Sequence, residues 1–229
     1  MLALSNATTF RRRLTGVTLV LGSAALVVST ALKDMNSNDA GDMLRTAAAH
    51  PDRLVASTAA QLVASILLVP ATIGVLHMIR GRGTALAHVG IGLMILNLLG
   101  NVADVTHSAL LGVLATGGVT PAEISIVDRL SSNALESTVE LMTLVGLLGF
   151  PIVAAALWRS GAVPRAIPAL IVVGAVSFFF PIPEVIGSVV MAAAFSWLGV
   201  DILGETDALW ERGWRDEPAA VADGRVVTA

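Results

Sequence analysis

Polar side chains recur at helical spacing inside a segment that is otherwise apolar enough for a lipid bilayer. The segment is NLLGNVADVTHSALLG, and four of its polar residues follow one another at intervals of four, three and four: Asn97, Asn101, Asp104 and Ser108. These intervals place the four side chains along one face of an α-helix. His107 lies three residues after Asp104, so the imidazole neighbours the carboxylate. Such a group can bind a cation, ligate a metal or exchange a proton.

A second polar face follows in the segment SSNALESTVELMT. Its members are Asn133, Glu136, Glu140 and Thr143. If the two segments are successive antiparallel helices, the two polar faces lie at similar depth, and Glu184 lies on the same side of the molecule. A charge isolated at the centre of a bilayer costs about 2.5–3.5 kcal/mol, so these groups are expected to face protein or water. We therefore predict an outward-opening acidic pocket with these binding residues: Asn101, Asp104, His107, Glu136, Glu140 and Glu184.

The elements that position these residues are apolar segments long enough to span a membrane. Of the 229 residues, 55% are hydrophobic and only 14% are charged, against about 25% charged in a soluble domain. Apolar segments of about 20 residues, the length that crosses a bilayer, recur along the chain. The fold class predicted is all-α, a six-helix transmembrane bundle, with spans at residues 14–32, 54–79, 85–114, 134–158, 167–180 and 184–203. A single kinked helix in place of the last two would be longer than a bilayer requires.

The basic residues alternate between the two sides of this bundle. Ten lie before the first span, after the last one or in the connections on that same side: Arg11, Arg12, Arg13, Arg80, Arg82, Arg159, Arg165, Arg212, Arg215 and Arg225. Four lie on the opposite side: Lys33, Arg45, Arg53 and Arg129. Cytoplasmic loops carry the excess of basic residues. Both termini are therefore predicted to be cytoplasmic, in a multi-pass protein of the cell membrane.

The chain divides into a six-span transmembrane domain, residues 1–204, and a cytoplasmic tail, residues 205–229. Trp210 and Trp214 share a helix face at the start of the tail, which predicts a short interfacial helix followed by disorder. A short helix is also predicted to begin near Pro121. Cleavage of the first span as a signal peptide is the alternative there, although its apolar run is long for that role.

Several kinds of chemistry find little support. Four-helix di-metal sites use Glu-x-x-His twice, whereas this chain has one Asp-x-x-His, so neither a metal nor another cofactor is expected. His77 and His88 could hold haem, but two histidines that flank a tight turn are more often polar residues at the membrane interface. The chain has no cysteine, and it lacks the basic patch with interleaved aromatic residues that nucleic-acid binding requires.

A purely structural reading of the polar residues stands beside the functional one. Asn133 and Glu136 form a capping pair for a helix N-terminus. Glu184 suits the first turn of a helix, where the macrodipole favours a carboxylate. Asp104 would then pair with His107 or with Arg129. Asp104 is the residue that this reading explains least well, because it is the deepest acid.

The segments LWRSGAVPRAIPALIVVGAV and PIPEVIGSVVMAAAFSWLGVDIL carry a resemblance to a known family. They resemble a bacterial six-pass integral membrane family of unknown function, and the matching residues are Arg159, Val163, Pro164, Arg165, Gly174, Glu184, Trp197 and Leu198. In span order and loop length the likeness runs from Arg11 to Leu203. The resemblance implies the fold and topology, and it brings no activity, substrate or site residue.

Three functions are compatible with the sequence. The first is a small carrier or binding protein whose acidic pocket takes a proton, a cation or an amphipathic amine. The second is a membrane-embedded enzyme that uses Asp104, His107 and Glu140 on a lipid or other apolar substrate. The third is a structural or partner-binding subunit. The lipid bilayer is the one partner that the sequence predicts in all three cases, and the oligomeric state stays open.

Overall fold

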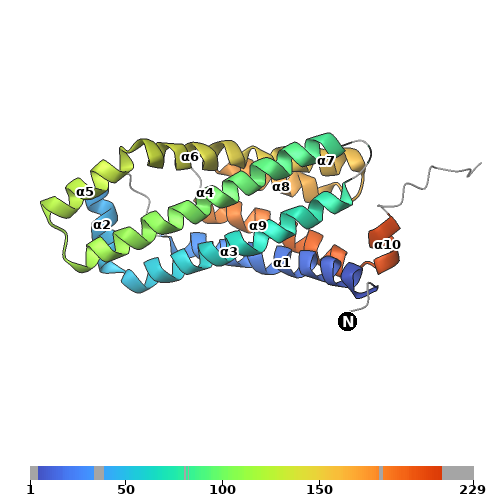
Figure 1. Cartoon of the computed structure of the whole chain (residues 1–229), viewed down its shortest axis with the longest axis horizontal. Coiled ribbons are helices and arrows are strands. Elements are labelled where there is room, and N and C mark those ends of the chain that lie inside the picture. Colours follow the sequence, from blue (N-terminus) through green and yellow to red (C-terminus); the bar gives the residue numbers. More distant parts are fainter. Residues whose placement is uncertain (1–4, 34–38, 80, 82, 181–182, 213–229) are drawn as a thin grey trace, which may run out of the picture.

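The computed structural model describes residues 5–33, 39–79, 81, 83–180 and 183–212. Within these residues the chain is entirely helical, without β-strands. The helices are α1 (Ser5–Leu32), α2 (Ala40–Ala49), α3 (Pro51–Met78), α4 (Thr84–Thr116), α5 (Pro121–Ser131), α6 (Ala134–Leu147), α7 (Gly149–Ser160), α8 (Ala166–Ser177), α9 (Glu184–Gly204) and α10 (Asp207–Arg212). Figure 1 shows the long helices side by side along one axis, with α2 and α5 at one end and α10 at the other. Pro181, Arg80, Arg82 and the tail after Arg212 lie outside the described residues.

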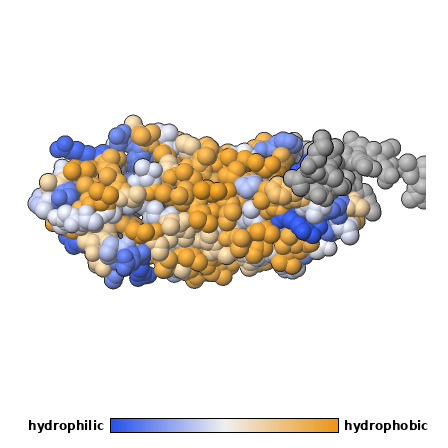
Figure 2. Space-filling model, turned by 60° about the horizontal axis from the view of Figure 1, so that its bottom comes forward, coloured by the Kyte–Doolittle hydropathy of each residue, from blue (hydrophilic) through white to orange (hydrophobic). Residues whose placement is uncertain are grey.

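Five helical segments are long and apolar enough to cross a membrane: Ala7–Leu32, Pro51–Met78, Thr84–Thr116, Ala134–Ser160 and Glu184–Gly204. This confirms a multi-pass membrane protein. The fifth predicted span corresponds to α8, a shorter apolar helix of 12 residues, about 18 Å at 1.5 Å per residue. On the face shown in Figure 2, hydrophobic surface covers the middle of the molecule and hydrophilic groups gather toward its ends. The count of six spans and the side that each terminus faces stay predictions.

The centre of the bundle is held by close approaches between helices. α1 packs on α3 and on α9. A Cβ placed on Gly16 would lie 2.8 Å from the carbonyl oxygen of Gly199, and a Cβ on Gly199 would lie 2.7 Å from that of Gly16. Small residues of this kind let membrane helices pack backbone to backbone. Larger side chains, such as Leu19 and Leu198, fill the core around these contacts.

The predicted span at residues 134–158 is interrupted at Leu148, which separates α6 from α7. Pro151 explains the interruption, because its nitrogen cannot donate to the carbonyl of Leu147 in the turn before. Both parts pack closely on α4. A Cβ on Gly146 would lie 2.4 Å from the backbone nitrogen of Asn97, and one on Gly149 would lie 2.5 Å from that of Met94.

Two short helices cover the end of the bundle where α4 finishes. α2 and α5 contact each other and α4, and their shared core includes Leu44, Leu111 and Val127, all nearly inaccessible to solvent. The predicted helix at Pro121 is confirmed as α5, which begins with a capping box between Thr120 and Glu123. α2 was not predicted. We call this end of the bundle the capped end.

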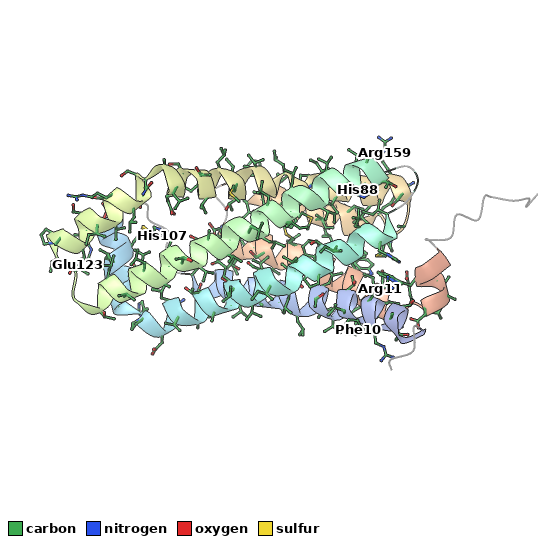
Figure 3. All side chains as sticks on the ribbon, viewed as in Figure 1. Phe10, Arg11, His88, His107, Glu123 and Arg159 are labelled. Atoms are coloured by element: carbon green, nitrogen blue, oxygen red, sulfur yellow. The ribbon has the colours of Figure 1, made fainter. Side chains whose placement is uncertain are left out.

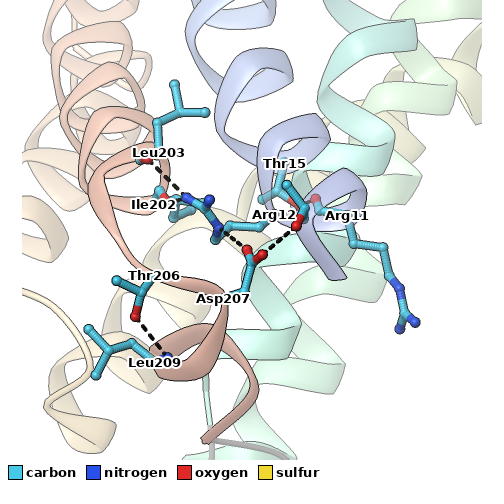
Figure 4. Close-up of polar contacts among 9 residues, drawn as sticks. Arg11, Arg12, Thr15, Ile202, Leu203, Thr206, Asp207 and Leu209 are labelled. Carbon is cyan, nitrogen blue, oxygen red and sulfur yellow. Dashed lines mark hydrogen bonds and ion pairs between the residues drawn. The ribbon is translucent and has the colours of Figure 1, made fainter. Parts of the chain in front are cut away.

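The opposite end brings the two described ends of the chain together. The buried guanidinium group of Arg12 donates to the carbonyl oxygens of Ile202 and Leu203, at 3.0 and 2.9 Å, and its Nε donates to Asp207 at 2.9 Å (Figure 4). The ring of Trp210 on α10 stacks on His77, with 4.8 Å between centroids. Figure 3 places Arg11, His88 and Arg159 at this end and Glu123 at the capped end.

Candidate binding cavity

A cavity of about 430 Å³ lies among the helices near the capped end. Helices α1, α3, α4, α6, α7 and α9 line it, together with Phe178 at the end of α8. Five of the six predicted site residues are among its lining residues: Asn101, Asp104, Glu136, Glu140 and Glu184. The structure therefore brings together acids from three helices that are distant in the sequence. No binding role follows from this placement alone.

The lining changes from polar to apolar along the bundle. On α3 the order away from the capped end is Gln61, Ser65 and Leu68. On α6 and α7 the order is Glu136, Glu140, Thr143, Leu147 and Phe150. On α4, Leu98 lies about two turns deeper than Asp104 and continues the trend, while the neighbouring Asn97 is a polar exception. Met191 lies near the bottom on α9. The cavity thus has an acidic mouth and an apolar floor.

Hydrogen bonds hold the polar face of α4 in place. The side-chain amide of Gln61 donates to the Asp104 carboxylate at 3.0 Å and to the carbonyl oxygen of Asn101 at 3.2 Å. Asn101 donates to the side-chain oxygen of Asn97 at 3.1 Å. Asn97 in turn donates to the carbonyl oxygen of Thr143 at 2.8 Å, which ties α4 to α6. These bonds are the interhelical polar contacts expected within a membrane bundle.

His107 lies beside this network and does not line the cavity. Its Nδ1 is 3.3 Å from Oε1 of Glu136, and both side chains are largely shielded from solvent. In Figure 3 the ring sits between α4 and the neighbouring ends of α5 and α6. The structure thus corrects the expectation that Asp104 pairs with His107 or with Arg129, because the hydrogen-bond donor to Asp104 is Gln61. Glu136 reaches His107, while Asn133 alone caps α6, by accepting from the nitrogen of Leu135.

The short length of α8 explains why the cavity exists. α6 packs on α4, and α7 packs on both α4 and α8. α8 ends at Ser177, after about 18 Å, so it accompanies α7 in one half of the bundle only. In the other half α6 has no such neighbour among the described helices, and the space between α6 and the start of α9 becomes the cavity.

The sequence missed the contribution of α1. Ser29, Thr30 and Lys33 line the mouth of the cavity, and Lys33 brings a positive charge to it. Lys33 is the only lysine of the chain, and it directly follows the last residue of the first predicted span. Its place just outside an apolar segment was visible, but no pattern within the sequence indicates that α1 and α6 face each other.

The cavity has the electrostatic character of a cation site. Four carboxyl groups line it, from Asp104, Glu136, Glu140 and Glu184, against one ammonium group. Across the described part of the chain, no three His, Asp or Glu side chains converge as a ligand set for a metal ion. The cavity therefore suits a ligand held by charge and by apolar contact.

His88, which the sequence offered with His77 as a pair of haem ligands, is not among the residues that line the cavity. Its ring lies 2.8 Å from the carbonyl oxygen of Thr84 in its own helix.

Comparison with known proteins locates the chain within a family. Neither the curated proteins nor the solved structures contain a significant match to it. A family model described as Domain of unknown function (DUF4386) matches residues 14–210. The match includes every helix that lines the cavity. The chain therefore belongs to the DUF4386 family of proteins of unknown function.

Proposed function

We propose that this chain is a small carrier or binding protein of the cell membrane whose acidic cavity opens outward and takes an amphipathic cation. The ligand class is an organic amine that bears an apolar tail. One observation carries the proposal, namely the cavity of about 430 Å³ with four carboxyl groups at its mouth and Leu68, Phe150 and Met191 at its floor. Small-molecule sites in proteins have this size, about 300–1,000 Å³, and combine apolar walls with a few polar groups.

Charge and burial both favour such a ligand. An ammonium group at the mouth would reduce the repulsion among the four carboxylates, and surrounding apolar walls strengthen the attraction because they lower the effective dielectric constant. The tail would gain about 25 cal/mol for each Å² of apolar surface removed from water. The tail would lie between helices rather than in the lipid.

Binding of dodecylamine to the purified full chain, measured by isothermal titration calorimetry in dodecyl maltoside, tests this function. The Glu140→Gln variant removes one charge of the cavity. Glu140 has an exposed side chain that makes no hydrogen bond or ion pair with the described residues, so the fold should survive the change. We expect at least tenfold weaker binding.

Asp128→Asn is the matched control, because Asp128 is an exposed acid of α5 that does not line the cavity. It should bind dodecylamine as the wild type does. Equal affinities of the wild type and Glu140→Gln would refute the proposed site, and so would equal weakening in both variants.

A further inference from the structure

A second, smaller pocket adjoins the acidic cavity at the capped end. It has a volume of about 30 Å³ and lies among α1, α2, α3 and α4. Its described ionisable lining residues are all basic: Lys33, His50 and Arg53. Hydroxyl groups of Thr46, Ser57, Thr58 and Ser108 and the amide of Gln61 complete its polar lining, and none of the described carboxyl groups lines it. We call it the basic pocket.

The basic pocket and the acidic cavity share part of their lining. Lys33 and Gln61 line both of them. Gln61 also donates directly to Asp104, so only one side chain separates the basic lining from an acid of the cavity. Among the described residues, the ammonium group of Lys33 has no carboxylate within ion-pair distance. None of the described carboxylates therefore compensates its charge.

The basic pocket also lies where two candidate membrane spans end. Lys33 follows the last residue of α1, and His50 and Arg53 flank the start of α3. These are the ends of two spanning segments. Lysine and arginine are the side chains that bind phosphate in proteins.

We propose that the ligand is a single-tailed amphiphile that carries an ammonium group and a phosphate together, as lysophosphatidylethanolamine does. This assignment rests on the proposed function and narrows its ligand class. Along the ligand the phosphate lies between the tail and the ammonium group, so it is placed at Lys33, which lines both spaces. The ammonium group turns back toward Asp104, Glu136 and Glu140. The tail follows the apolar lining toward Phe150. The ammonium group then faces the acidic lining and the phosphate faces the basic lining, on either side of Gln61.

Four probes separate the parts of this ligand: lauroyl lysophosphatidylethanolamine, lauroyl lysophosphatidic acid, dodecylamine and tail-less phosphoethanolamine. Each is titrated calorimetrically into the purified full chain in dodecyl maltoside at fixed salt. We expect the first probe to bind at least tenfold more tightly than each of the other three. Equal binding of phosphoethanolamine would contradict a site for a lipid, and equal binding of dodecylamine would contradict a role for the phosphate.

The Lys33→Gln variant tests the basic pocket itself. It should remove most of the advantage of lysophosphatidylethanolamine over dodecylamine, because dodecylamine has no phosphate to lose. Its effect on dodecylamine should be no change or tighter binding. Arg45→Gln is the control, since Arg45 is an exposed base on α2 that lines neither space, and it should leave all four affinities unchanged.

The outcomes distinguish a failure of the phosphate site from a failure of the proposed function. If Lys33→Gln weakens dodecylamine as much as the phospholipid, or leaves their ratio unchanged, the phosphate site is wrong. The proposed function then stands as long as dodecylamine binds in a manner that depends on Glu140. If none of the tailed probes binds the wild type, both proposals fail.

Discussion

The carboxylate of Asp104 on α4 accepts a hydrogen bond of 3.0 Å from the side-chain amide of Gln61 on α3. This contact explains how an acid is tolerated in a segment that otherwise suits lipid. An isolated charge at the bilayer centre costs about 2.5–3.5 kcal/mol, and a hydrogen bond to a charged group is worth about 1.5–3 kcal/mol. The bond and the polar cavity together offset a large part of that cost.

Replacing Gln61 by leucine should therefore destabilise the protein by about 1.5–3 kcal/mol, because Asp104 loses its donor. The measurement is unfolding of the purified protein in mild detergent. The double variant Gln61→Leu/Asp104→Leu should be less destabilised than Gln61→Leu alone, since no carboxylate is left without a partner. A neutral Gln61→Leu variant would show that the bond does not matter.

The sequence predicted this polar face well and its partners poorly. Helical spacing groups Asn97, Asn101 and Asp104 because each helix turn has a fixed number of residues. It does not reveal which other helix supplies the donor, since that depends on the packing of α3 against α4. For this reason the sequence suggested His107 or Arg129 as the partner of Asp104, where the structure has Gln61.

The remaining differences have similar physical causes. α2 was missed because its sequence AGDMLRTAAA is short and its apolar residues are mostly alanine. It is held in place by burial of Leu44 against Leu111 and Val127, a tertiary contact. The short fifth span was recognised from Pro181 and Pro183, but its consequence, a cavity beside α6, follows only from the arrangement of the helices.

Gly146 should be sensitive to any side chain, because a Cβ there would lie 2.4 Å from the backbone of α4 at Asn97. Overpacking of this kind costs about 1–3 kcal/mol, so Gly146→Ala should lower the melting temperature in detergent. Gly92→Ala is the control on α4, where a Cβ meets no atom within 4 Å. It should be neutral or slightly stabilising. Equal melting temperatures of the two variants would contradict the close packing of α6 on α4.

The contact between Arg12 and Asp207 should make stability depend on pH in the acidic range. Hydrogen bonds from Thr9 and then from Arg12 lower the pKa of Asp207 below its usual 3.8. A lowered pKa means that the folded state binds this proton less tightly than the unfolded state does. The stabilisation is therefore present above about pH 4 and is lost as the pH falls through the folded-state pKa.

Burial raises the pKa of neighbouring Glu205, which makes stability depend on pH in the opposite sense. The Asp207→Asn variant keeps Glu205, so the difference between wild type and variant isolates the effect of Asp207. The melting temperature of the wild type should exceed that of Asp207→Asn at neutral pH, and the gap should narrow as the pH falls below the usual pKa of Asp207, 3.8. A gap that is constant with pH would contradict the ionic role of Asp207.

The orientation of the bundle is a separate prediction. The chain has no cysteine, so single cysteines can report on each side. Arg45→Cys on α2 should react with a membrane-impermeant maleimide in intact cells. Arg159→Cys, at the opposite end of the bundle, should react only after the membrane is permeabilised. The reverse pattern would place both termini outside the cytoplasm and overturn the topology.

The most direct test of the acidic, outward-opening cavity is the reaction of Val139→Cys in intact cells, because Val139 lines the cavity between Glu136 and Glu140. Two impermeant methanethiosulfonate reagents of opposite charge are compared, with and without dodecylamine. We predict that the cationic reagent reacts at least tenfold faster than the anionic one, that Glu140→Gln reduces this ratio, and that dodecylamine protects the thiol. No reaction from outside, or equal rates for the two reagents without protection by dodecylamine, would contradict the account.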